Sequence, residues 1–139
     1  MLGRLFMHAI QTQEPNESAR DAALRVARDR GVDLGWEMRQ KTTRRQPGPQ
    51  GTLRAVERTL EMYGFEPYRP EPDVIRLGNC PFRDLAMEAP QLVCEVNRSF
   101  LEGVIRGLGD DVVQAVLERS PGGCCVSVRS VRGGGAIGG

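Results

Sequence analysis

One stretch decides most of the expected fold: Val74-Ile75-Arg76-Leu77-Gly78-Asn79-Cys80-Pro81-Phe82. Its opening apolar run is typical of a strand, and Pro81 ends that strand because proline has no backbone N–H to donate to a neighbour. A short helical segment, Arg83 to Met87, follows and leads to a second cysteine, Cys94. We therefore expect a strand that closes at Cys80 and a helical layer directly after it.

Three helices are expected before this strand. Apolar residues between Leu2 and Ile10 recur at helical spacing, and such a stripe at the start of a chain favours packing on a second subunit or on the body of the domain. Ser18, followed three residues later by an aspartate, indicates the start of a helix whose small inward residues suit close packing and which ends at Gly31. Thr52 is expected to cap a third helix that ends before Gly64.

The remaining elements complete an α+β fold. Phe65 to Tyr68 forms a strand that a proline-rich turn joins to the central stretch, and its prolines favour an edge position. A long helix begins at Pro90, and the apolar residues from Val112 to Leu117 are interpreted as a further helix. Cys124 to Val128 alternates like a final strand. We expect a small antiparallel sheet with helices on one face.

The chain is accordingly divided into four parts. Residues 1–38 are N-terminal helices for linking and dimerisation, and residues 39–51 are a flexible basic loop rich in proline and glycine. Residues 52–131 form the α+β domain that contains the cysteines. Residues 132–139 are a glycine-rich tail that is expected to be disordered.

Composition narrows the class of function. A net charge of +1 supplies no broad basic field for binding DNA. Since no apolar run is long enough for a membrane span or a signal peptide, a cytoplasmic protein without membrane contact is expected. Thiols stay reduced in that compartment, which favours the four cysteines as metal ligands or redox groups over a disulfide framework.

Three of the cysteines are candidate metal ligands. Cys80 ends a strand, Cys94 lies beside the buried side of the long helix, and Cys124 shares a strand face with buried valines. Three thiolates with one open position suit an iron–sulfur cluster, or zinc with a fourth partner. Glu95 is a candidate oxygen ligand or an exposed helix carboxylate. Because buried cysteine is also common in plain cores, three structural thiols remain the alternative at this point.

A family resemblance favours the cluster. The run Gly64-Phe65-Glu66-Pro67, the pattern Ile75-x-Leu77-x-Asn79-Cys80-Pro81-Phe82-x-x-Leu85-Ala86, the segment from Val93-Cys94 to Leu101-x-Gly103, and Gly123-Cys124-x-Val126-x-Val128 follow one another in order. Together they resemble the C-terminal sensor domain of ArsR/DeoR-type winged-helix transcriptional regulators, in the branch that includes the Suf-operon repressor (SufR). The resemblance covers roughly Leu53 to Val128.

The resemblance implies a function and a ligand set. It implies a sensor domain in which Cys80, Cys94 and Cys124 bind an iron–sulfur cluster, of the [4Fe-4S] type, that controls DNA binding in response to redox or iron–sulfur status. Cys125 is an extra thiol that strand parity points away. DNA would be contacted only through a winged-helix domain that this chain lacks, so Leu2 to Gly31 would be linker and dimerisation helices of a homodimer.

Two other classes of function are alternatives to a cluster-binding sensor. In one, Val96, Phe100 and Val104 enclose an apolar pocket for a small molecule, and the cysteines hold zinc or simply pack. The other class is an enzyme. His8, the single histidine, lies far along the chain from every cysteine, so no cysteine–histidine pair is indicated and we assign no catalytic residue.

Overall fold

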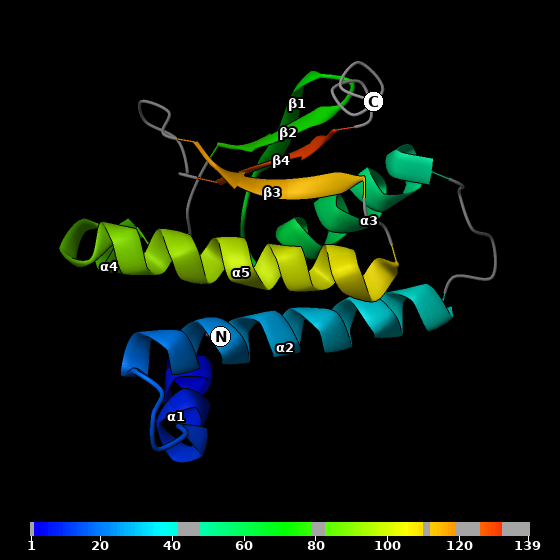
Figure 1. Cartoon of the computed structure of the whole chain (residues 1–139). Helices are drawn as coiled ribbons and strands as arrows, with labels where there is room; N and C mark the ends of the chain where they lie inside the picture. The colour runs from blue at the N-terminus through cyan, green and yellow to red at the C-terminus, as the bar shows by residue number, and fades with distance from the viewer. Residues whose placement is uncertain (1, 42–47, 79–82, 110–111, 119–125, 132–139) are drawn as a thin grey trace.

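The fold is α+β: a four-stranded antiparallel sheet carries helices on one of its faces (Figure 1). The computed structural model describes residues 2–41, 48–78, 83–109, 112–118 and 126–131. The elements in this part of the chain are α1 (Leu2–Thr12), α2 (Ala19–Lys41), α3 (Gly48–Met62), β1 (Pro67–Glu71), β2 (Val74–Leu77), α4 (Arg83–Glu88), α5 (Pro90–Leu108), β3 (Val113–Leu117) and β4 (Val126–Ser130).

The sheet has the strand order β1-β2-β4-β3. Ile75 of β2 lies opposite Val128 of β4, which in turn lies opposite Ala115 of β3. All three side chains are buried, so one face of the sheet lies on the core. β1 is an edge strand, as its two prolines predict, since Pro67 and Pro70 have no N–H for a second neighbour.

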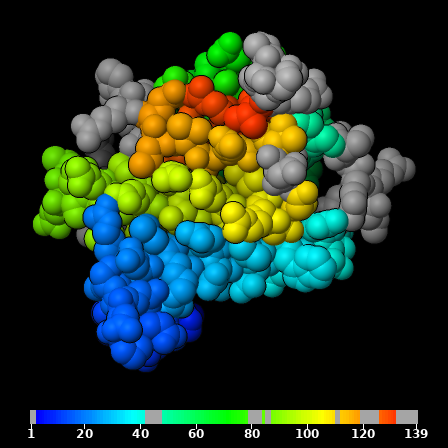
Figure 2. Space-filling view, viewed as in Figure 1, coloured from blue at the N-terminus to red at the C-terminus, as the bar shows by residue number. Residues whose placement is uncertain are grey.

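The helices form two layers beneath the sheet (Figure 1). α3 and α5 contact the sheet directly, and α2 lies along the opposite side of α5. α1 contacts α2 and projects away from the sheet at one corner of the molecule, as Figure 2 also shows. α2 thus belongs to the helical layer further from the sheet (Figure 1).

The contact between α2 and α5 is unusually close because glycines line it. A Cβ added to Gly31 would lie 2.1 Å from the Phe100 carbonyl oxygen, and one added to Gly103 would lie 2.1 Å from that of Arg28. One turn further along, Gly35 and Gly107 meet in the same way. Only a hydrogen fits at these positions, so backbone packs on backbone without intervening side chains.

Several local signals are confirmed. The Ser18 hydroxyl accepts a hydrogen bond from the Asp21 backbone N–H at 3.0 Å and caps α2. Pro90 occupies the first turn of α5. Gly64 ends α3 with φ of 88°, and the Phe65 N–H bonds the Leu60 carbonyl at 3.0 Å, which is a Schellman ending.

Two helix boundaries differ from expectation. α2 does not end at Gly31 but continues to Lys41, because the glycine that should break it is needed for close packing on α5. α3 begins at Gly48, so Thr52 is a buried residue within the helix and not its cap. The expected loop 39–51 is therefore helical at both ends, and residues 42–47 lie outside the described residues.

The segment after α5 is a strand and not the helix that its apolar spacing predicts. Val113–Leu117 is strand β3, which pairs with β4 from Val113↔Ser130 to Leu117↔Val126. Apolar residues at 112, 113, 116 and 117 fit a helical repeat as well as a strand. The segment becomes a strand because β4 offers an edge for hydrogen bonding, and Gly109, with φ of 85°, ends α5 before it.

Within the described part of the chain, no helix is long and apolar enough to cross a membrane. The glycine-rich tail, 132–139, lies outside the described residues.

Candidate functional site

Cys94 lies on the second turn of α5, close to the end of α4. Its side chain is half-buried, between Val93, which faces the core, and Glu95. Cys94 is disulfide-bonded in the structure. This differs from the expectation of reduced thiols. Cys80, Cys124 and Cys125 all lie outside the described residues.

Glu95 links the cysteine-bearing end of α5 to the start of α2. Its carboxylate forms an ion pair with the Arg20 guanidinium, and the two side chains are 28% and 46% exposed. Arg20 lies in the first turn of α2, so a residue adjacent to Cys94 is tied directly to the N-terminal helices. Glu95 is a partly exposed carboxylate, but it already has a cationic partner and is a poor candidate for a metal ligand.

Asn97 is the unusual polar residue near Cys94, and sequence reasoning missed it. It lies three residues further along α5, is 2% exposed, and its Nδ2 has no hydrogen-bond partner among the described residues. A buried amide donor without a partner is rare because its desolvation is not compensated. The only signal in the sequence is an asparagine within the apolar repeat of the helix, between Val96 and Phe100.

The described residues alone form no metal centre. Among them, no group of three or more histidine, cysteine, aspartate or glutamate side chains could hold an ion. Two of the three expected ligands, Cys80 and Cys124, fall outside that part of the chain. The site with Cys80, Cys94 and Cys124 therefore stays a prediction.

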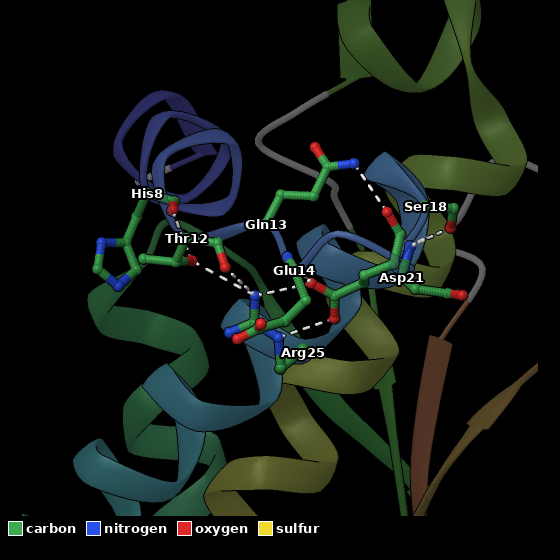
Figure 3. A network of polar contacts seen from close by, with 8 residues as sticks. His8, Thr12, Gln13, Glu14, Ser18, Asp21 and Arg25 are labelled. Carbon is green, nitrogen blue, oxygen red and sulfur yellow. Dashed lines mark hydrogen bonds and ion pairs between the residues drawn. The ribbon is translucent and has the colours of Figure 1, made fainter.

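A polar junction holds α1 to α2 (Figure 3). Arg25 of α2 donates hydrogen bonds to both carboxylate oxygens of Glu17, at 2.9 and 3.0 Å, and to the Thr12 carbonyl at 3.1 Å, where α1 ends. The hydrogen bond from Arg25, supported by the Glu14 backbone N–H, lowers the pKa of Glu17 below its ordinary value of 4.5. Glu17 in return raises the pKa of Arg25. The junction is thus a charged pair at neutral pH.

The residues considered for a small-molecule pocket belong to the core. Val96, Phe100 and Val104 are at most 3% exposed, and Phe100 packs edge-on against Tyr63 with ring centroids 5.5 Å apart. They line neither a hollow of about 750 Å³ between α5 and β3 nor one of about 820 Å³ between α1 and α2. His8 is exposed on the rim of the second hollow, and no cysteine is among the described residues that line this hollow.

Comparison with known proteins does not assign the chain: no protein-family model matches it, and no curated protein does either.

Proposed function

We propose that this chain is the sensor domain of a SufR-like transcriptional regulator and that Cys80, Cys94 and Cys124 bind an iron–sulfur cluster. The observation that carries the proposal is the ordered set of sequence motifs around Cys80, Cys94 and Cys124, of which Cys94 is half-buried near the start of α5. The disulfide of Cys94 is compatible with it, because a cysteine that forms a disulfide when oxidised can ligate a metal when reduced.

The helical layers offer a route from the cysteines to the N-terminal helices. α5 carries Cys94 and packs through glycine contacts on α2, while Glu95 pairs with Arg20 at the start of α2. α2 in turn holds α1 through Arg25 and Glu17. A ligand that shifts the first turns of α5 therefore biases the position of α1, as in other two-state sensors.

The domain would respond to redox status because the same cysteines can exist either as thiolates that bind iron or as a disulfide that does not. Iron binds thiolates, whereas the disulfide is the product of removing two electrons and two protons from a pair of thiols. A sulfur atom in the disulfide is not available as a thiolate ligand. Oxidation therefore favours the cluster-free domain, and reduction restores its capacity to bind the cluster.

A homodimer through α1 fits the same scheme. Leu5 and Ala9 pack on α2, but Met7 and Ile10 of α1 are 62% and 72% exposed. Exposed apolar side chains on a projecting helix favour contact with a second copy. DNA would be bound by a winged-helix domain outside residues 1–139, in the cytoplasm.

An anaerobic ultraviolet–visible spectrum, with iron, sulfide and zinc analysis on the same reconstituted sample, tests the proposal. Broad absorbance near ~400 nm with matched iron and sulfide supports it. Stoichiometric zinc without sulfide would replace it with a zinc-binding regulatory domain. A protein that takes up neither metal would leave the cysteines with a structural role only.

A further inference from the structure

We propose that β3 is an edge for strand addition, at which two copies of this domain pair antiparallel and join their sheets into one. The partner is β3 of a second copy, related to the first by a two-fold axis at Val116. The inference goes beyond the proposed function, because the contact requires no metal and uses none of the cysteines. It also differs from the contact through α1, since it is formed by another element.

β3 lies at an open edge of the sheet. Among the described residues, β4 is the only strand that pairs with it. The Val131 N–H bonds the Val112 carbonyl at 2.8 Å, so residue 112 and every second residue after it point their polar backbone groups at β4. The N–H and C=O groups of Ala115 and Leu117 therefore point away from β4. Figure 2 shows β3, in orange, at the surface beside α5.

The two edges of the sheet are built differently. β1 contains two prolines, and its register with β2 is irregular between Tyr68 and Glu71, which hinders the addition of a further strand. β3 has neither a proline nor a charged residue, and its register with β4 is regular from Val113 to Leu117. Leu117 is 42% exposed. β3 thus lacks the features that protect an edge, which is typical of a strand that pairs with another.

β3 is complementary to itself in one antiparallel register. When Val116 lies opposite its own copy, Ala115 of each chain lies opposite Leu117 of the other, and each such pair exchanges both N–H···O hydrogen bonds. A small side chain then faces a large one, while the two half-buried valines form a β-branched pair on the other face. Gln114 lies opposite Glu118, whose carboxylate is already paired with two arginines of its own sheet. No like charges face each other in this register.

The charges beside the edge favour a second copy over an unrelated strand. Arg98, Glu102 and Arg106 line the hollow of about 750 Å³ between α5 and β3, so basic and acidic side chains alternate along this side of α5. β3 runs back along α5 (Figure 1), and the two-fold axis therefore sets two copies of α5 antiparallel as well. Four helical residues and two strand residues each span about 6 Å. An axis that exchanges Ala115 with Leu117 thus also suits the exchange of Glu102 with Arg98, which brings opposite charges together.

Sedimentation velocity across a concentration series tests the contact with variants of Val116. Val116→Lys places two like charges opposite each other, so association should weaken about tenfold or more. Gln114→Lys is the matched control: it adds the same charge to the same face of β3, but opposite Glu118, and should associate as wild type does. Val116→Glu should also weaken association, and an equimolar mixture of the lysine and glutamate variants of Val116 should restore it. If one of these two does not fold, the other carries the comparison with Gln114→Lys.

Hydrogen exchange separates this contact from one through α1. The amides of Ala115 and Leu117 should be protected in associated wild-type protein and should lose protection on dilution and in Val116→Lys. The α1 amides should be equally protected in wild type and in this variant. Protection of the two β3 amides that persists at every dilution would overturn the inference, because the edge would then be covered within one chain. Equal association of wild type and Val116→Lys, or equal weakening by Val116→Lys and Gln114→Lys, would overturn it as well.

Discussion

Gly35 of α2 and Gly107 of α5 meet backbone to backbone: a Cβ added to Gly107 would lie 3.0 Å from the Gly35 Cα and 2.3 Å from the Val32 carbonyl oxygen. With Gly31 and Gly103 one turn away, they make two small-residue pairs at i, i+4 spacing on facing helices. Glycine within a helix costs roughly 1 kcal/mol relative to alanine. These glycines are tolerated because the close approach of the two backbones compensates that cost.

Gly35→Ala is accordingly expected to destabilise the protein. The added methyl would lie 2.2 Å from the Val104 carbonyl oxygen and would force the two helices apart. We expect a loss of about 1–3 kcal/mol in the free energy of unfolding, as for other overpacked cores. Gly3→Ala is the matched control: a Cβ there meets nothing within 4 Å, so helix propensity should make it slightly stabilising. Urea unfolding of both variants measures the difference, and equal stability would contradict the packing described.

Cys94→Ser should abolish uptake of iron and sulfide, because serine does not replace a thiolate ligand of a cluster. Cys125→Ser is expected to leave uptake nearly intact, because the strand alternation that the sequence predicts from Cys124 to Val128 would place this thiol on the opposite face. Metal and sulfide analysis after anaerobic reconstitution measures both variants side by side. An equal loss in the two would refute the ligand assignment.

Protein purified in air should bind no cluster until it is reduced. The Cys94 disulfide must gain two electrons and two protons, for which dithiothreitol suffices, before either of its sulfurs can bind iron. Thiol titration with and without prior reduction should differ by two thiols per chain. Full cluster uptake by protein that has not been reduced would contradict this order of events.

The ion pair between Arg20 and Glu95 should contribute little to the free energy of unfolding. It should contribute more to the coupling between cluster binding at the start of α5 and the position of α2. Both side chains are partly exposed, so Arg20→Gln is expected to change the free energy of unfolding by less than about 1 kcal/mol. The same variant should weaken the effect of cluster binding on hydrogen exchange in the first turn of α2. The charge-reversed double variant, Arg20→Glu with Glu95→Arg, should restore that effect. An unchanged exchange response in Arg20→Gln would exclude the pair from the coupling route.

The junction between α1 and α2 should loosen in acid. Because Arg25 lowers the pKa of Glu17, the carboxylate stabilises the folded junction above its ordinary pKa of 4.5, and this contribution is lost as the pH falls through the lower folded value. The protection factors of the α1 amides, which correct for the intrinsic slowing of exchange in acid, should therefore fall below about pH 4.5. In Glu17→Gln, the α1 amides should be weakly protected from exchange already at neutral pH. Their protection should change little on acidification, because residue 17 no longer titrates. A similar pH response in wild type and variant would place the acid sensitivity elsewhere.

The sequence by itself determined the elements whose ends are set by local chemistry. Ser18 caps α2, Pro90 begins α5, Gly64 ends α3, and the prolines of β1 keep it at the sheet edge; each effect acts within a few residues along the chain. The helices and strands that these local signals delimit were enough to predict the α+β class.

Tertiary structure alone decided the features that depend on a distant partner. Gly31 breaks a helix in isolation, but α2 continues through it because the backbone of α5 lies against it. Val113–Leu117 fits a helical repeat until β4 provides an edge to pair with. The ion pair of Arg20 with Glu95 likewise arises only when residues far apart in sequence pack together, and so does the burial of the Asn97 amide, whose Nδ2 has no partner among the described residues. No local pattern encodes either feature.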